Sequence, residues 1–176
     1  MKGLCLLVKP FFVFNKKLPR IESMSLTSLI AAACTQYTVL NEAWRKVTGF
    51  GPSVNGGRYH CDTWRPGGNR GIKEGWHRFS GPAGTHLPTE RLNSGAGARE
   101  VCGTSIVAWM DGSHPTVYED VVSRPFCFEW DSGPCQFTVR SEVKTCPDPD
   151  DPGRTFYVYK LKQPPGIQCN WGYCAL

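Results

Sequence analysis

The sequence lacks the long apolar run that a membrane-spanning helix needs. Such a helix takes about 20 consecutive, predominantly apolar residues. Lys9 and Pro10 interrupt the only early candidate, and charged residues or glycines break every later one. We therefore expect no membrane span.

An excess of basic charge is missing from most of the chain. The formal net charge is +5, but nearly all of the excess falls in residues 1–33, where acidic side chains are scarce. Proteins that bind nucleic acid contact its phosphates through a basic patch. The near-neutral remainder of the chain offers no such patch, so nucleic acid is not an expected partner.

The sequence motifs of common enzymes are missing as well. There is no Gly-X-Ser-X-Gly motif, no His-Glu-X-X-His motif and no phosphate-binding glycine loop. His114 lies near Ser113 and Asp111, but sequence neighbours rarely have the geometry of a catalytic triad, and this segment predicts a turn. We expect neither enzymatic activity nor a cofactor.

What the chain does contain is a mixture of turn formers and bulky apolar residues. Its 176 residues include 19 glycines, 14 prolines, six tryptophans and nine phenylalanines. A chain of this length can bury one sizeable core. This composition is typical of a single loop-rich domain with short strands.

The clearest strand patterns lie in the second half of the chain. Residues 104–110 are apolar and β-prone, and residues 137–144 alternate apolar with charged side chains. After an acidic, proline-rich turn comes a third β-prone run, residues 155–161, which predicts an antiparallel pair with 137–144. Residues 76–79 also resemble a strand. The predicted fold is mostly β: a small, disulfide-rich, loop-rich domain with short antiparallel strands.

The N-terminus has the order of a secretory signal. A basic run at residues 16–20 precedes an apolar run from Met24 to Ala33, which ends in three alanines that suit a cleavage site. We predict a signal or targeting segment at 1–33 and one domain at 34–176. Two alternatives remain open: an N-terminal amphipathic helix packed on the domain, and Met24 as the true initiator.

The cysteines predict a disulfide framework. Cys5 falls in the predicted signal segment, and an even set of eight remains: Cys34, Cys61, Cys102, Cys127, Cys135, Cys146, Cys169 and Cys174. An even set favours four disulfides and an oxidising, extracellular compartment, and 105 pairings are open. No Cys-X-X-Cys pair exists and the four histidines do not have zinc-finger spacings, so we expect no metal site.

The order of residues from Cys34 to Cys174 follows a known family pattern. The matching segments are Trp44-Arg45, Cys61-Asp62, Gly75-Trp76-His77-Arg78-Phe79-Ser80-Gly81, Cys102-Gly103-Thr104, Gly112-Ser113-His114-Pro115, residues 156–161 and Tyr173-Cys174. This order resembles the eight-cysteine domain of the uromodulin and pancreatic secretory granule membrane major glycoprotein family.

The chain also departs from that pattern. Family members usually carry a cysteine between Gly84 and Cys102, where this chain has none, so its disulfide pattern is expected to differ in part. The growth-factor-like repeats and the polymerising module that flank the domain in large relatives are not in this sequence. We expect a stand-alone module or a fragment, and filament formation does not carry over.

The resemblance implies an extracellular recognition module. In mammalian relatives, mannose-rich N-glycans on such domains act as decoys for bacterial adhesins, but none of the six asparagines here has Ser or Thr two positions later. Recognition must therefore use protein surface or O-linked sugars. The candidate binding residues are Trp64, Arg65 and Arg70, because exposed tryptophan and arginine side chains supply large contact areas and are enriched where binding energy is concentrated. A solvated loop without a partner is the alternative for these three.

The sequence thus predicts a secreted, disulfide-stabilised binding module. Its expected partner is an extracellular protein or a microbial or host surface ligand, in host defence or cell-surface recognition, with the ligand and the oligomeric state open. A structural component of matrix or mucus is the alternative. Six aromatic residues at family positions are expected in the core: Trp44, Trp76, Phe79, Trp109, Phe156 and Tyr159. Arg45 and Arg78 are expected to pair with carboxylates such as that of Asp62.

Overall fold

The computed structural model describes residues 32–47, 59–64, 71–92, 101–128 and 135–176. Almost all of the predicted signal segment lies outside these ranges, as do Arg65 and Arg70 of the predicted binding loop. The proposed boundary after residue 33 therefore stays a prediction.

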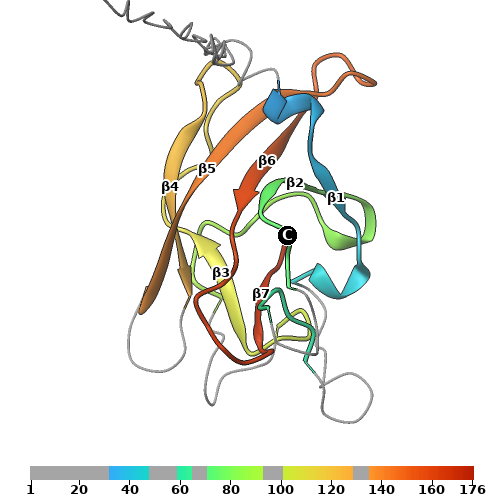
Figure 1. Cartoon of the computed structure of the whole chain (residues 1–176). Helices are drawn as coiled ribbons and strands as arrows, with labels where there is room; N and C mark the ends of the chain where they lie inside the picture. Colours follow the sequence, from blue (N-terminus) through green and yellow to red (C-terminus); the bar gives the residue numbers. More distant parts are fainter. Residues whose placement is uncertain (1–31, 48–58, 65–70, 93–100, 129–134) are drawn as a thin grey trace, which may run out of the picture.

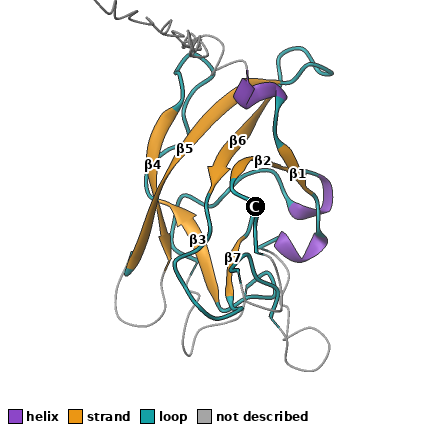
Figure 2. Cartoon of the chain, in the orientation of Figure 1, coloured by secondary structure: helices purple, strands orange, loops and turns teal. Residues whose placement is uncertain are grey.

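Within the described ranges, seven strands form one sheet (Figure 1). The strands are β1 (Thr38–Leu40), β2 (Gly75–Phe79), β3 (Ile106–Met110), β4 (Val122–Phe128), β5 (Phe137–Pro147), β6 (Thr155–Leu161) and β7 (Trp171–Tyr173). Their order across the sheet is β1-β2-β6-β5-β4-β3-β7. Among the residues that the structure describes, helix is limited to a turn at residues 32–35 and the short 3-10 helices η1 (Ala43–Arg45) and η2 (Gly81–Ala83) (Figure 2). The prediction of a small, mostly β domain is confirmed.

The middle of the sheet is antiparallel and its two edges are parallel. β5 pairs antiparallel with β6 from Val143–Tyr159 to Pro147–Thr155, which confirms the pair predicted across the acidic turn. β1 runs parallel to β2, and β7 runs parallel to β3. Beyond the edges, Lys46 forms a bridge with Ala175, so the chain after β1 is joined to the chain after β7.

The main core lies on one face of this sheet. Because side chains alternate along a strand, Tyr159 and Leu161 of β6 point to the same side as their neighbours Val143 of β5 and Phe126 of β4. All four side chains are buried in one apolar cluster. Aromatic rings meet edge to face inside it, Phe126 against Tyr159 with centroids 6.2 Å apart.

The predicted core aromatics divide into two groups. Phe79, Phe156 and Tyr159 are buried, as expected. Trp44, Trp76 and Trp109 are only half-buried. Large rings at family positions therefore also lie at the rim of the core, where one edge contacts solvent.

The opposite face of the sheet is covered only in part. A helical turn at residues 32–35 packs there, and Ala33 is fully buried against Phe156 and Val158. Further along β6, Lys160 points to the same side and is exposed. No helix among the described residues has the length and the apolar character needed to cross a membrane.

Four disulfides close the fold. The pairs are Cys34–Cys146, Cys61–Cys169, Cys102–Cys174 and Cys127–Cys135. All eight predicted cysteines are paired, and the pairing that the sequence left open is now assigned. Three of the bridges join positions far apart in the chain, with separations of 112, 108 and 72 residues, and the fourth spans only 8.

Candidate functional site

An open hollow of about 420 Å³ lies where β1, β2 and η1 meet the segment 59–64. We call it the polar hollow. Its walls are formed by Thr38 and Leu40 of β1, Glu42, Trp44, Arg45, Tyr59 to Asp62, Gly71 to Lys73, His77 and Cys169. Apolar and polar side chains contribute together, which is typical of binding sites that orient a ligand.

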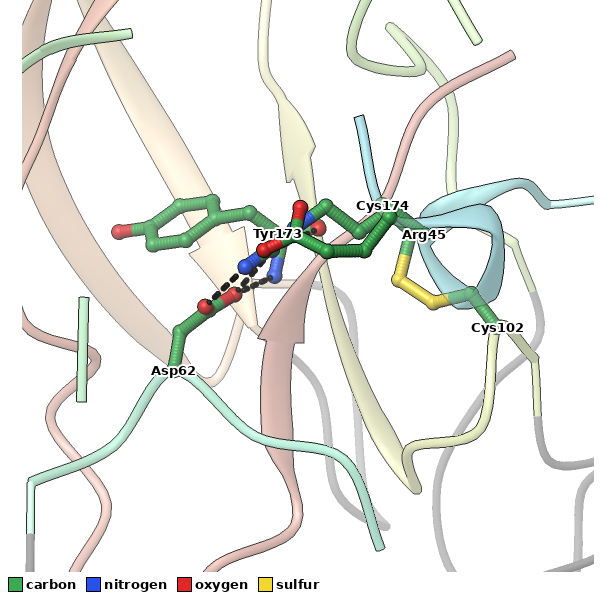
Figure 3. The surroundings of a disulfide bond; sticks show 6 residues. Arg45, Asp62, Cys102, Tyr173 and Cys174 are labelled. Carbon is green, nitrogen blue, oxygen red and sulfur yellow. Dashed lines mark hydrogen bonds and ion pairs between the residues drawn. A yellow bond between two sulfur atoms is a disulfide. The ribbon is translucent and has the colours of Figure 1, made fainter. Parts of the chain in front are cut away.

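Arg45 is the buried cation at this hollow. Its two terminal nitrogens donate hydrogen bonds of 2.8 Å to the two carboxylate oxygens of Asp62, and one of them also donates to the Tyr173 carbonyl at 3.1 Å (Figure 3). Its Nε donates to Glu42 Oε2 at 2.9 Å. A two-point arginine–carboxylate pair is directional and strong. The expected pairing of Arg45 with Asp62 is confirmed.

Asp62 joins three parts of the chain through its carboxylate. Besides Arg45 of η1, it accepts the backbone N–H of Tyr173 in β7 at 2.8 Å. The Arg45 and Asp62 side chains are both buried, so the cost of removing each charge from water is offset by its interaction with the other. The Cys102–Cys174 disulfide lies beside this cluster and ties the same end of β7 (Figure 3).

Arg45 and Glu42 both have shifted pKa values. Burial disfavours charge on Arg45, but the hydrogen bonds and charge of Asp62 outweigh it and raise the arginine pKa. Burial likewise opposes ionisation of Glu42, yet the charge of Arg45 and local hydrogen bonds lower its pKa. Both side chains therefore remain charged at neutral pH, and the carboxylate of Glu42 is partly open to solvent.

His77 supplies a neutral imidazole to the wall of the polar hollow. Its Nδ1 lies 2.8 Å from the Gly75 carbonyl, which can only accept, so Nδ1 carries the proton. Burial lowers the pKa of His77, and the charge of Arg45 lowers it further. The ring is therefore uncharged at neutral pH and keeps Nε2 as its acceptor.

Aromatic surface completes the wall. The rings of Trp44 and His60 are stacked with centroids 4.7 Å apart and an angle of 9° between them. The guanidinium of Arg45 lies 4.1 Å from the Trp44 ring centroid, a cation–π contact. Lys73 is exposed at the rim. The site thus offers partly exposed aromatic rings, hydrogen-bond acceptors and one exposed cation to a polar ligand.

The predicted binding loop begins and ends beside the polar hollow. Trp64 is 55% exposed and follows the buried pair Asp62 and Thr63 directly. At the other end of the loop, the Ile72 N–H donates to the Asp62 carbonyl at 2.9 Å. Gly71 has a φ of +69°, and a Cβ there would lie 2.7 Å from the Trp64 nitrogen. Arg65 and Arg70 lie outside the described residues, so their contacts are not placed.

Sequence reasoning missed Glu42, Lys73 and His77 as lining residues. Glu42 and His77 are 35 positions apart in the chain, and they meet only because β1 pairs with β2. No local motif links them. Arg78, the other arginine expected to pair with a carboxylate, pairs with Asp148 at 3.2 Å and packs over Phe156.

His114, the histidine of the rejected triad, lies in a separate cluster. Its Nε2 is 2.7 Å from the Tyr159 hydroxyl, and that hydroxyl accepts the Leu87 N–H at 3.1 Å. Tyr159 therefore donates its own proton to His114. Burial, together with the nearby His86 and Arg124, lowers the pKa of His114 to about 4. His114 therefore has a structural role: its neutral ring accepts the hydrogen bond of the buried Tyr159 hydroxyl. Among the described residues, no three His, Cys, Asp or Glu side chains converge as metal ligands.

Comparison with known proteins identifies relatives of this chain. Residues 77–175 match the family model of the uromodulin-like eight-cysteine domain. The chain is 34% identical to uromodulin of Rattus norvegicus over 147 residues, which is 81% of this chain and 18% of that protein. It is 30% identical to the pancreatic secretory granule membrane major glycoprotein of Canis lupus familiaris over 142 residues, 81% of this chain and 23% of that protein. The chain thus spans about a fifth of the length of these relatives.

Proposed function

Because the chain belongs to the uromodulin-like eight-cysteine domain family, we propose that it is an extracellular recognition module that binds a protein or glycan on a host or microbial surface. The polar hollow is the proposed binding surface, with Trp64 at its edge. Arg65 and Arg70 belong to the proposed contact set because their loop starts and ends at this hollow.

One observation carries this proposal: the hollow combines open ligand-binding groups with walls that are already fixed. The ion pair of Arg45 with Asp62 and the Cys61–Cys169 disulfide hold its base, while Trp64 remains exposed beside it. A preformed site loses less conformational freedom when it binds. The same arrangement contains groups suited to hydrogen bonding and stacking, which favours recognition over catalysis.

The proposed location is outside the cell. Four disulfides are typical of proteins that fold in an oxidising compartment. One of the relatives is named for the membrane of a secretory granule. Residues 1–33 are the proposed export segment. N-terminal sequencing of the protein collected from culture medium tests this, since a chain that retains residues 1–33 would contradict it.

Binding is tested with the secreted protein on arrays of neutral host and microbial glycans and of extracellular protein domains. We expect saturable binding that Trp64→Ala and Lys73→Ala each weaken by about tenfold, because Lys73 lines the polar hollow and Trp64 is an exposed aromatic side chain that closely follows the lining residue Asp62. Tyr118→Ala is the matched control, since Tyr118 is 95% exposed and does not line the hollow. Binding that both substitutions leave unchanged would reject this surface.

The same preparation tests the structural alternative. Sedimentation of the protein without ligand should show no concentration-dependent association if its function is recognition. Self-association at micromolar concentration, together with no saturable binding on either array, would instead support a component of matrix or mucus.

A further inference from the structure

A second hollow, of about 200 Å³, lies over β4, β5 and β6. Register places it on the face that points away from the main core. Glu142 stands opposite Ser123 of β4, and its carboxylate contacts Lys160 of β6, whereas the neighbouring Val143 and Tyr159 are buried in the core. Residues on one strand alternate between faces, so the hollow opens on the side where the sheet is only partly covered.

Positive charge dominates this second hollow. Lys160 Nζ lies 2.7 Å from Glu142 Oε2, so these two charges compensate one another. Arg140 and Lys162 line the same hollow, are exposed, and have no ion-pair partner among the residues that the structure describes. Like charges held close together on a sheet repel. An anion bound between Arg140 and Lys162 would relieve that repulsion, whereas the remainder of the domain is close to neutral.

An aromatic ring lies next to these cations. Trp76 of β2 pairs with Lys160 of β6 in the sheet, and the ammonium of Lys160 lies 5.9 Å from the Trp76 ring centroid. Trp76 is half-buried, so part of its ring remains open to solvent. A flat aromatic edge beside a cationic pocket fits a sugar ring that carries an acidic group.

We propose that this surface binds the acidic group, sulfate ester or carboxylate, of an acidic glycan. We call it the cationic hollow and define it by its lining residues Ser123, Arg140, Ser141, Glu142, Lys160 and Lys162. Arg140 and Lys162 supply the charge that attracts the acidic group, and the Ser123 hydroxyl supplies a neutral donor. The site is separate from the polar hollow, with which it shares no lining residue, so it does not depend on the function proposed there.

Calorimetric titration of the folded chain tests the ligand class. The probes are a size-defined heparin hexasaccharide, the same hexasaccharide after desulfation, which keeps its carboxylates, a sialylated trisaccharide, and the neutral sugar left when sialic acid is removed from that trisaccharide. We expect saturable binding of at least one acidic sugar, weakened by added salt, and none of the neutral sugar. Binding that desulfation abolishes assigns sulfate as the acidic group, and binding of the desulfated or the sialylated sugar assigns carboxylate. No saturable binding of any acidic sugar, or equal binding of the sialylated sugar and its neutral counterpart, would overturn the proposal.

Charge-matched variants test the location. Arg140→Ala with Lys162→Ala should weaken binding of the acidic sugar by about tenfold, whereas Lys46→Ala with Arg154→Ala should weaken it less than about twofold. Both pairs remove two exposed cations, so the Tm of each double variant should match that of the parent. Glu142→Gln should tighten binding, because it removes the one acidic side chain among the described residues that line the cationic hollow. Equal losses in the two double variants would show attraction to net charge alone and would overturn the site.

Discussion

The β4–β5–β6 part of the sheet and the polar end around Arg45 are held together in different ways. The three strands follow one another in sequence, and their contacts are antiparallel backbone ladders with a buried apolar face. At the polar end, Arg45 bonds to Asp62, which lies 17 positions away in the sequence, and Asp62 bonds to Tyr173, which lies 111 positions away. The conformational entropy lost when these distant segments are brought together is offset there by a few specific contacts.

This difference indicates which part of the molecule is most sensitive to the loss of a single residue. Burial in the β4–β5–β6 region is spread over many side chains, so the loss of one contact leaves the others in place. The polar end depends on one ion pair and two long-range disulfides, and the proposed ligand surface lies on it. Damage to single residues should therefore affect that end most.

The largest expected effect comes from comparing two disulfides. Replacing Cys61 and Cys169 by alanine opens a loop of 108 residues, and replacing Cys127 and Cys135 opens one of 8. We expect the first pair to lower the free energy of unfolding by about 4–5 kcal/mol and the second by about 2–3 kcal/mol, because a longer closed loop restricts the unfolded chain more. Denaturant unfolding measures both. Equal losses would contradict the contrast between the two regions.

The next largest effect concerns the buried ion pair. Asp62→Ala leaves the Arg45 guanidinium without its buried carboxylate and should lower the free energy of unfolding by about 3–5 kcal/mol. Glu42→Gln is the control, because Glu42 touches the same arginine from an exposed position and should cost less than about 1 kcal/mol. If Asp62→Ala were as mild as the control, the polar end would not depend on this pair.

The contrast also explains what the sequence could predict. β5 and β6 were predicted because alternation and β-branched or aromatic residues are local signals, and their pairing needs only a short turn. β4 was missed because Pro125 argues against a central strand. The structure shows why proline is tolerated at position 125. The Pro125 carbonyl accepts the N–H of Asp111, which lies just past the end of β3, so the Pro125 nitrogen also faces β3 and not β5. The hydrogen bonds between β4 and β5 therefore lose no donor.

The candidate site was less predictable than the strands. Trp64 and its glycine-rich loop were singled out from residue type, and the pairing of Arg45 with a carboxylate such as Asp62 was expected from how a buried arginine must pack. The polar hollow itself arises from the parallel pairing of β1 with β2 and from β7, each edge strand only three residues long. Such short strands have no periodic pattern to read, and their partners lie far away in sequence.

A smaller effect on stability is expected when the pH is lowered, and it tests the contact of His114 with Tyr159 of β6. The folded pKa of His114 is about 4, below the value of about 6.5 in an unfolded chain. The neutral ring that accepts from Tyr159 is therefore stabilising above pH 6.5, and that contribution is lost as the pH falls toward 4. His114→Gln keeps an acceptor without a proton to gain, so unfolding midpoints measured from pH 7 to pH 4 should fall less steeply. An unchanged slope would contradict this role.

The smallest effect is expected on the exposed face. Lys160→Ala and Glu142→Ala break an ion pair whose side chains are 46% and 42% exposed. Solvent and salt screen such pairs, so each change should alter the free energy of unfolding by less than about 1 kcal/mol. A loss as large as that of Asp62→Ala would mean that the two regions are not held together differently.

Amide chemical-shift mapping of the labelled protein with a ligand found on the arrays tests whether the polar hollow is the binding surface. We expect saturating ligand to shift the amides of Thr38, His60 and Trp64 in and beside the polar hollow, while those along β5 stay in place. A ligand that saturates the protein but shifts only amides remote from this hollow would contradict the claim.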